Sequence, residues 1–413
     1  MQTDGFSLPV TVSGGFVTLE RIQISPKFVD APCAYFDLPS VRFGVRMYRN
    51  SQVYNRGRRR TVVMSLLQNT LNRIQPLDEG AMAQARARQD TLTKPQGSLG
   101  RLEDLSVQIA GITGDLTPQI KDKSLLVMAA DHGIAREGVS AYPPEVTPQM
   151  VLNFLSGGAA INVLARLVGA RVVVVDVGVN HDFDPEAGLL DFKIASGTAN
   201  MVNGPAMTRE QAVAAIEAGI QAMELEVEWG VDLVGTGDMG IGNTTASSAI
   251  TAAYTGLPVA QVTGRGTGLD DAQLAAKIAT IERVLALNRP DSSDPLDVLS
   301  KVGGFEIGGI AGVILGAAAN RVPVIIDGFI SGAGALIAAS LNPAAVNYMI
   351  AAHCSVEVGH RAILARLGLE PLLDLNLRLG EGTGAALAMN IVEGAVRILD
   401  EMATFASAGV SEK

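Results

Sequence analysis

The stretch VDLVGTGDMGIGNTT, residues 231–245, predicts the fold class of this 413-residue chain. Its first four residues are typical of a strand buried on both faces, and a turn of glycines and small polar residues follows at once. Similar apolar runs followed by such turns occur at 125–129, 172–177, 322–326 and 348–351. Helical stretches rich in Ala and Leu lie between the runs, at 150–167, 209–226, 272–287 and 356–367. This alternation predicts an α/β fold with an open, mostly parallel sheet and Rossmann-like layering, which binds ligands at the carboxyl ends of its strands.

Composition and charge exclude several functional classes. Hydrophobic residues make up 48% of the chain and charged residues 18%, as expected for a soluble globular protein. The net charge of −10 argues against a nucleic-acid or membrane partner, because either would need a basic face. Cys33 and Cys354 are too few for a disulfide framework or a Cys-rich zinc site. No apolar run reaches the ~18 residues that span a bilayer, so we expect a cytoplasmic protein that acts on small molecules.

The chain divides into three regions by composition. Residues 1–63 carry eight of the 18 aromatic residues and nine basic against four acidic residues, without a sustained period. We interpret them as an N-terminal extension that is poorly ordered, or as the product of a start site placed too early, with Met64 the natural beginning. Residues 64–112 and 385–413 are helical without intervening strands and are predicted to form a smaller helical subdomain. Residues 113–384 are predicted to form the α/β catalytic domain.

The glycines of the opening stretch also match a rival interpretation. Gly235, Gly237 and Gly240 follow a strand with the spacing of a dinucleotide-binding fingerprint, as in NAD-dependent dehydrogenases. That fingerprint needs an acidic residue ~20 positions further on, whereas position 260 is Ala. Asp238, inside the turn, would also repel a pyrophosphate. The pattern therefore disfavours a dehydrogenase, although a nicotinate mononucleotide hydrolase and a non-catalytic nucleotide-binding regulator stay as alternatives.

Six ordered strings carry a family resemblance. They are TKPQGSLGRLEDL (93–105), AADHG with EGVSAYPPEVT (129–147), GTGDMGIGNTT (235–245), KVGGFEIGGIAGVILGAA (301–318), VPVIIDGFISGAGAL (322–336) and RLGEGTGAALAM (378–389). Together they resemble the nicotinate-nucleotide:dimethylbenzimidazole phosphoribosyltransferases, which assemble the lower-ligand nucleotide of cobalamin. The resemblance implies transfer of a 5-phosphoribosyl group from nicotinate mononucleotide to 5,6-dimethylbenzimidazole, giving α-ribazole 5′-phosphate and nicotinate. It covers residues 64–405 and leaves 1–63 without a counterpart.

The resemblance also implies the catalytic residues. Glu381 matches the general base of the family, and its neighbours suggest a partly desolvated carboxylate, although alone it could be a charge at a helix N-terminus. Asp238 matches a second acid that is commonly Glu, so its side chain is one methylene shorter. Because the pyridinium leaving group is neutralised as its bond breaks and no pyrophosphate leaves, we expect neither a metal nor a cofactor.

Further residues match the substrate contacts of the family. The resemblance places the phosphate and ribose of the nucleotide against Gly240, Gly266, Lys277, Asp327, Gly328 and Ser355. It places the benzimidazole against Tyr142, Met150, Met239 and Leu379. Taken singly, each has a structural explanation: Lys277 is also typical of a solvated helix surface, and Ser355 of a helix N-cap. His132, without any metal-binding spacing, is expected to be hydrogen-bonded within its own turn.

A homodimer is the last prediction from the sequence. The segments 307–320 and 330–340 are apolar on nearly every side, so each must be covered all round. A two-fold partner is the simplest cover, and the members of the resembled family are dimers. We therefore expect a homodimer with each active site completed near the subunit contact. The alternative is that both helices lie inside one subunit.

Overall fold

The computed structural model describes residues 34–38, 41–45 and 64–411 of the chain. Residues Met64–Lys413 belong to one compact unit and Met1–Val63 to another. In the N-terminal unit, strands β1 (Ala34–Leu38) and β2 (Val41–Val45) pair in an antiparallel manner. The prediction of a poorly ordered extension otherwise lies outside the described residues.

The main unit is built on a six-stranded sheet. Its strands are β3 (Lys123–Ala130), β4 (Ala170–Gly178), β5 (Leu190–Asp191), β6 (Leu233–Met239), β7 (Val324–Ile326) and β8 (Met349–Ala351). Their order is β5-β4-β3-β6-β7-β8, and every neighbouring pair is parallel. This is the doubly wound order, in which the direction of winding across the sheet reverses between β3 and β6. The predicted fold class is confirmed.

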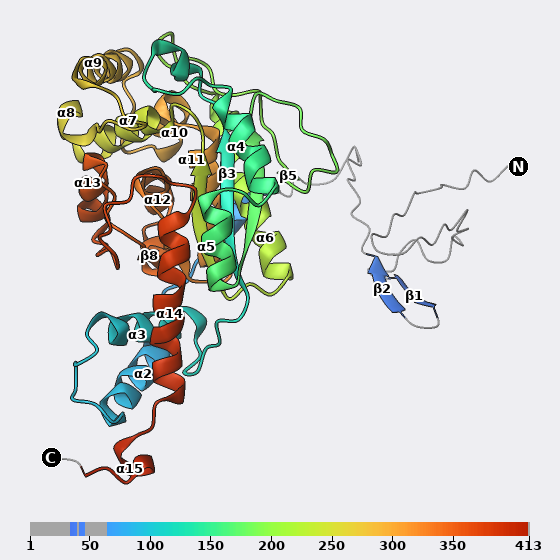
Figure 1. Cartoon of the computed structure of the whole chain (residues 1–413), viewed down its shortest axis with the longest axis vertical. Helices are drawn as coiled ribbons and strands as arrows, with labels where there is room; N and C mark the ends of the chain where they lie inside the picture. Colours follow the sequence, from blue (N-terminus) through green and yellow to red (C-terminus); the bar gives the residue numbers. More distant parts are fainter. Residues whose placement is uncertain (1–33, 39–40, 46–63, 412–413) are drawn as a thin grey trace, which may run out of the picture. The chain divides into compact units, whose positions relative to one another are not determined.

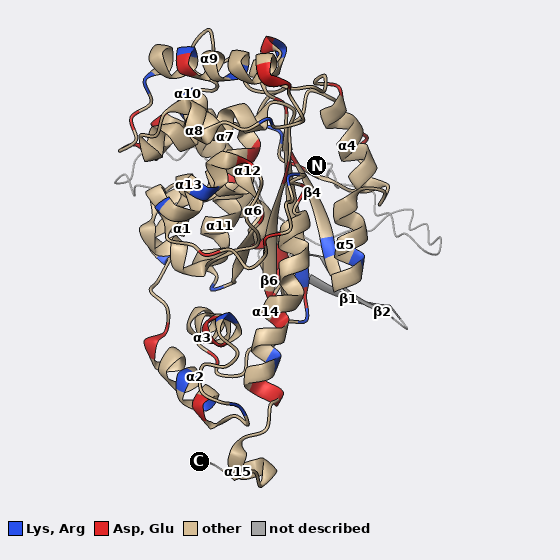
Figure 2. Ribbon diagram, turned by 60° about the vertical axis from the view of Figure 1, so that its left-hand side comes forward, with Lys and Arg blue, Asp and Glu red and all other residues tan. Residues whose placement is uncertain are grey.

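Helices cover both faces of the sheet. One layer contains α4 (Val146–Leu155), α5 (Ala160–Val168) and α14 (Thr383–Glu401). The opposite layer contains α6 (Arg209–Glu228), α11 (Phe305–Ala319) and α12 (Phe329–Leu341). Figure 2 shows α4 and α5 on one side of the sheet and α6 and α11 on the other. All eight residues of β3 are buried between the layers, as expected for a central parallel strand.

A further group of helices lies in the chain between β6 and α11. It contains α7 (Asn243–Thr255), α8 (Val259–Val262), α9 (Asp271–Asn288) and α10 (Pro295–Val302). Helix α13 (Val358–Leu367) follows β8 and packs against α7, α8 and α12. The short helices are η2 (Gly133–Glu137), η3 (Pro343–Tyr348) and α15 (Phe405–Ala408). Figure 1 shows α7, α8 and α9 gathered near the carboxyl end of the sheet, on the side away from α2 and α3.

The terminal helices of the main unit pack together in part. Helices α2 (Glu79–Thr91) and α3 (Arg101–Thr113) lie against the far half of α14, around a small cluster of Ala85, Val107, Ala110 and Leu399 (Figure 1). In contrast, α1 (Leu66–Arg73) packs against α6 and α11. Because α14 is one continuous helix that also contacts β6, it joins this helical group to the sheet, and the boundaries at 112 and 385 stay predictions.

The two apolar helices are covered within one subunit, so the argument that they need a partner is wrong. Every residue from Phe305 to Ala318 in α11 is buried, as are the first ten residues of α12. Glycines allow α6 and α11 to touch: a Cβ on Gly219 would lie 1.9 Å from the carbonyl oxygen of Gly309. Thus α6, α12 and the sheet supply the cover that was assigned to a second copy.

One apolar segment also corrects a sequence expectation. Among the described residues, Val146–Val168 is long and apolar enough to cross a membrane by length and composition. It consists of α4 and α5, whose regular helix is interrupted around Gly157 and Gly158. Both helices pack one face against β4, while Leu152, Val163 and Leu167 are exposed.

Candidate active site

Buried carboxylates gather at the carboxyl edge of the sheet. Asp131 follows β3, Asp238 lies in β6 and Asp327 follows β7, while Glu306 begins α11 and Glu381 precedes α14. Burial raises the pKa of Asp238 well above its usual value, and the neighbouring charges of Asp327, Glu306 and Glu381 raise it further. Other charged residues occur on outer helices such as α2 and α9 (Figure 2). Carboxylates confined in this way are typical of a site that handles protons or positive charge.

Glu381 occupies an unusual backbone position. Its φ is +63°, and Gly380 and Gly382 on either side also have positive φ, at +81° and +94°. The Glu381 side chain is buried, and its Oε2 accepts a hydrogen bond from the backbone N–H of Ile161 at 3.3 Å. Burial raises the pKa of the carboxyl, with a further contribution from the charge of Asp327. Raising the pKa in this way makes a carboxylate a better general base.

Gly235 and Gly237 of β6 support this loop by close packing. A Cβ on Gly237 would lie 2.4 Å from the carbonyl oxygen of Glu381, and one on Gly235 would lie 3.0 Å from the Cβ of Ala385. These two glycines of β6 therefore allow the loop and the start of α14 to rest on the strand. In the sequence these glycines match the spacing of a dinucleotide fingerprint, whereas in the structure they make room for close packing.

Asp238 lies beside the same loop. Its Oδ2 accepts a hydrogen bond from the side chain of Asn243 at 3.0 Å, and its Oδ1 has no hydrogen-bond partner. A Cβ on Gly380 would lie 3.1 Å from Oδ2, so the loop passes directly over this carboxyl group. The free Oδ1 is available to a bound molecule.

Three predicted phosphate contacts come together on a second set of elements. Lys277 in α9 is buried, and its Nζ donates to the Oγ1 of Thr244 at 2.7 Å. A Cβ on Gly266 would lie 3.2 Å from the same Nζ. The Gly266 N–H donates to Glu357 at 2.9 Å, and the Glu357 N–H donates to the Oγ of Ser355 at 3.3 Å. Burial lowers the pKa of Lys277 to about 8, and the charge of Glu357 opposes this shift.

Thr244 and Glu357 were missed by sequence analysis. Thr244 stands in the string GNTT directly after the glycine turn, where a hydroxyl near a helix start was a detectable signal. Glu357 offers no local signal, because its importance comes from bridging to Gly266, 91 residues away. Its Oε2 is buried without a hydrogen-bond partner.

The remaining predicted nucleotide contacts have clear packing roles. A Cβ on Gly240 would lie 2.5 Å from the carbonyl oxygen of Ala130, so this glycine lets β6 end close to β3. A Cβ on Gly328 would lie 3.2 Å from Nε2 of His353. Asp327 accepts hydrogen bonds from the N–H groups of Gly382 and Ala385, at 3.2 and 2.9 Å. Its engagement with α14 was not foreseen from the sequence.

The four predicted benzimidazole contacts divide into two pairs. Met239 ends β6 and Met150 lies in α4, and both are half-buried against the main core. Tyr142 and Leu379 are exposed, at 56% and 58%. The two methionines thus pack against the core of the subunit, whereas Tyr142 and Leu379 are open to solvent.

His132 departs from its expected environment. Its Nε2 lies 2.7 Å from Oε1 of Glu306, 174 residues further along the chain, and both side chains are buried. The attraction of this carboxylate raises the pKa of His132 despite its burial. The histidine is thus held by a tertiary ion pair, and the expected hydrogen bond within its own turn is not the contact that holds the ring. Glu306 is a buried acid that the sequence signalled only by its place in an apolar run.

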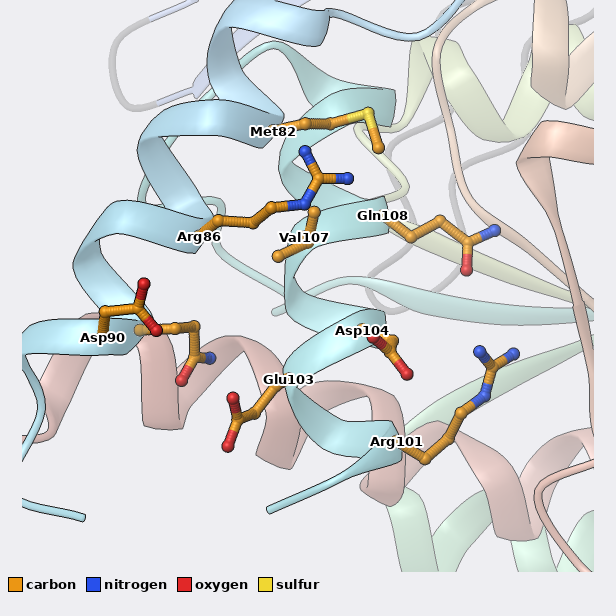
Figure 3. A pocket seen from close by; sticks show the side chains of 9 residues that line it. Met82, Arg86, Asp90, Arg101, Glu103, Asp104, Val107 and Gln108 are labelled. Atoms are coloured by element: carbon orange, nitrogen blue, oxygen red, sulfur yellow. The ribbon is translucent and has the colours of Figure 1, made fainter. Parts of the chain in front are cut away.

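A cavity of about 500 Å³ lies elsewhere, between α2 and α3. Figure 3 shows its lining, which includes Arg86, Asp90, Arg101 and Asp104. None of the site residues predicted from the sequence lines this cavity. In the part of the chain that the structure describes, no group of three or more His, Cys, Asp or Glu side chains is arranged to hold a metal ion.

The fold is a doubly wound α/β fold, and buried carboxylates gather at the point where its sheet reverses direction, which is where such folds bind their ligands. The family model for phosphoribosyltransferases matches residues 74–410. The chain therefore belongs to this phosphoribosyltransferase family.

Known relatives support the assignment over almost all of their own length. The chain is 66% identical over 350 residues to a nicotinate-nucleotide–dimethylbenzimidazole phosphoribosyltransferase of Chloroflexus aggregans, covering 85% of this chain and 99% of the relative. A Roseiflexus protein of the same name is 65% identical over 350 residues, with the same coverage. The crystal structure of such an enzyme from Thermus thermophilus superposes with a TM-score of 0.78 at 47% identity, covering 82% of this chain and 100% of that chain.

Proposed function

We propose that this chain transfers the 5-phosphoribosyl group of nicotinate mononucleotide to 5,6-dimethylbenzimidazole and releases nicotinate and α-ribazole 5′-phosphate. The observation that carries the proposal is the buried Glu381, held in a left-handed conformation at the reversal point of the sheet. The names of relatives that are 61–66% identical support the same substrates. The product would enter the nucleotide loop of cobalamin.

The proposed reaction is a single displacement at the anomeric carbon. The bond between that carbon and the pyridinium nitrogen breaks, and its electron pair neutralises the departing nicotinate ring. A ring nitrogen of dimethylbenzimidazole forms the new bond and becomes cationic. The N–H proton of the benzimidazolium then passes to Glu381, whose raised pKa suits this task. One carboxylate base is enough because the leaving group needs no proton.

We assign Asp238 to the positive charge that develops on the sugar. Its unpartnered Oδ1 and its place under the Glu381 loop support this role. A carboxylate near an oxocarbenium-like centre stabilises it electrostatically, as in glycoside hydrolysis. The raised pKa of Asp238 disfavours its ionised form in the free enzyme, and the positive charge of the bound pyridinium nucleotide would favour the carboxylate again.

We assign the phosphate to the group of Lys277, Gly266 and Ser355. A phosphate monoester needs a positive charge, backbone N–H groups and hydroxyls. Lys277 supplies the charge and Ser355 a hydroxyl, while Gly266 lies beside Lys277 with its own N–H bonded to Glu357. Gly240 and Gly328 line the path from this group to Glu381 in the proposed arrangement. The substrate phosphate would in turn favour the charged form of Lys277, whose pKa burial lowers to about 8.

We propose that the enzyme is a homodimer and that the contact lies close to the site. Exposed apolar side chains gather on two segments that pair through backbone hydrogen bonds, residues 354–358 and 373–379. They are Val356, Val358, Leu375 and Leu379. A subunit partner would cover them and so complete the benzimidazole site at Leu379. Light scattering should then give a mass near twice 43.0 kDa, whereas a mass near 43.0 kDa would refute the dimer.

We also propose a cytoplasmic location and small-molecule substrates as the only partners besides the second subunit. The net charge of −10 supports this, since it disfavours anionic polymers and lipid surfaces.

The decisive experiment supplies the protein with nicotinate mononucleotide and dimethylbenzimidazole and separates the products by chromatography. We expect α-ribazole 5′-phosphate and nicotinate in equal amounts. A parallel reaction without dimethylbenzimidazole should release no nicotinate. If nicotinate appeared there at the same rate, the chain would be a nicotinate mononucleotide hydrolase and the proposal would fail.

A further inference from the structure

We propose that Asp327 is a positioning residue, which holds the Glu381 loop in its reactive conformation through the first N–H groups of α14. The inference rests on the proposed function of Glu381 as the general base. It assigns to Asp327 a role different from the ribose contact that the family resemblance implies.

The hydrogen bonds of Asp327 carry the inference. Its side chain is fully buried after β7, and its two oxygens accept from the N–H groups of Gly382 and Ala385 at 3.2 and 2.9 Å. Such N–H groups at a helix start have no partner within the helix, so they favour an anionic acceptor. Gly382 directly follows Glu381 in the chain. The carboxylate thus anchors the backbone next to the catalytic side chain.

The loop needs such an anchor because Glu381 is strained. A residue other than glycine with φ of +63° is unfavourable, and it persists only where the surrounding structure determines it. On the β6 side, Gly237 leaves just enough room for the carbonyl oxygen of Glu381. On the β7 side, Asp327 accepts a hydrogen bond from the N–H of Gly382, the residue after Glu381. Contacts from two neighbouring strands, β6 and β7, therefore hold the loop.

His353 supports Asp327 from the next strand. Its Nε2 lies 3.8 Å from Oδ1 of Asp327, and both side chains are buried. A Cβ on Gly384 would lie 2.1 Å from the His353 ring, so only glycine at this place in α14 permits the approach. The ring therefore lies against both the carboxylate and the first turn of α14, next to the hydrogen bonds that join them.

The same arrangement influences the acidity of the base. The charge of Asp327 raises the pKa of Glu381, whereas the N–H group of Ile161 from α5 lowers it. Asp238 of β6 is a further carboxyl group whose charge interacts with Glu381, and His353 is the basic side chain that faces Asp327. An uncharged residue at position 327 would therefore remove both the anchor and one cause of the raised pKa of Glu381.

The first test is Asp327→Asn, which keeps size and removes the charge. An asparagine side chain has one acceptor oxygen, so one of the two N–H groups loses its partner. We expect kcat to fall by about 10–100-fold, KM for nicotinate mononucleotide to stay within about threefold, and the acidic limb of the kcat–pH profile to move to lower pH. A general loss of stability would not move that limb. A tenfold rise in KM with unchanged kcat and an unmoved limb would overturn the inference in favour of a ribose contact.

A second variant perturbs the loop from the other strand. In Gly237→Ala the new Cβ would lie 2.4 Å from the carbonyl oxygen of Glu381, so the loop must shift even if Asp327→Asn does not fold. We expect the same fall in kcat with KM retained. Gly394→Ala is the control. Gly394 lies in α14, the helix that follows the Glu381 loop, and a Cβ there would meet nothing within 4 Å. Full kcat in Gly237→Ala would overturn the inference.

The wild-type enzyme and Glu381→Gln separate the two proposals. If the wild type formed no α-ribazole 5′-phosphate, the proposed function itself would fail. If the wild type were active and Glu381→Gln inactive while Asp327→Asn kept full kcat and its pH profile, only the positioning role would fail.

Discussion

Replacing Glu381 by Gln tests the chemistry most directly. The two side chains have the same length, and the Gln oxygen can still accept the hydrogen bond that the N–H of Ile161 donates at 3.3 Å. The loop should therefore keep its conformation, because the variant leaves the backbone contacts with Gly237 and Asp327 intact. The amide cannot take the benzimidazolium proton. General-base catalysis contributes about 10²–10⁴ in rate, so we expect kcat to fall by that factor, or roughly 3–5 kcal/mol in the activation barrier.

The pH dependence gives an independent measure of the same group. Burial and Asp327 raise the pKa of Glu381 above 4.5, and the base is active only when ionised. The kcat of the wild type should therefore fall as the pH drops through a value above 4.5, and this limb should be absent from the residual activity of Glu381→Gln. The assay follows α-ribazole 5′-phosphate at saturating substrates, with calorimetry to show that nicotinate mononucleotide still binds.

Glu401→Gln serves as the control for this variant. Glu401 lies at the far end of α14, where it is exposed and paired with Arg397, so kcat should not change. If Glu381→Gln kept more than half of the wild-type kcat, or if its acidic limb were unchanged, Glu381 would not be the base.

Three other variants test the phosphate group, the buried ion pair and the extension. Lys277→Met keeps an extended side chain and removes the charge, so KM for nicotinate mononucleotide should rise about 10–100-fold with a smaller effect on kcat; an unchanged KM would exclude Lys277 from phosphate binding. Glu306→Gln leaves His132 buried without its carboxylate and should lower the free energy of unfolding by about 3–5 kcal/mol in urea titrations. Because pairing raises the pKa of His132 above 6.5, the stabilisation should be full below pH 6.5 and disappear as the pH rises through the raised value; equal losses at about pH 5 and pH 9 would contradict this. Deletion of residues 1–63 should leave folding and turnover unchanged, and aggregation or loss of activity would show that these residues belong to the fold.

Local sequence pattern determined the class of fold. Apolar runs of four to six residues, each followed by glycine and small polar residues, predicted parallel strands, and five of the six strands of the sheet lie on or overlap those runs. Burial on both faces explains why this worked, because it forces a nearly continuous apolar run on a short segment. The two-residue β5 was missed, since Leu190–Asp191 carries no such run.

Family motifs, together with residue chemistry, identified the candidate site residues but not their contacts. Glu381, Asp238 and Lys277 were singled out before any geometry was known, and all three are buried side chains in the structure. The residues that contact the site from a distance were not found. Glu306, Thr244 and Glu357 bond to His132, Lys277 and Gly266, each more than 30 positions away in the chain. The pattern of one sequence indicates which side chains are buried. It says almost nothing about which residues from distant parts of the chain contact them.

Tertiary structure alone decided three further features. The strand order places β6 between β3 and β7, which brings Asp238 and Asp327 to the same edge as Glu381. Packing of α14 on β6 gives Gly237 its purpose, because the glycine makes room for the Glu381 loop. The cover of α11 by α6 and α12 could not be read from its apolar composition. The physical reason is common to all three: periodicity shows that a surface must be buried, whereas long-range packing selects what buries it.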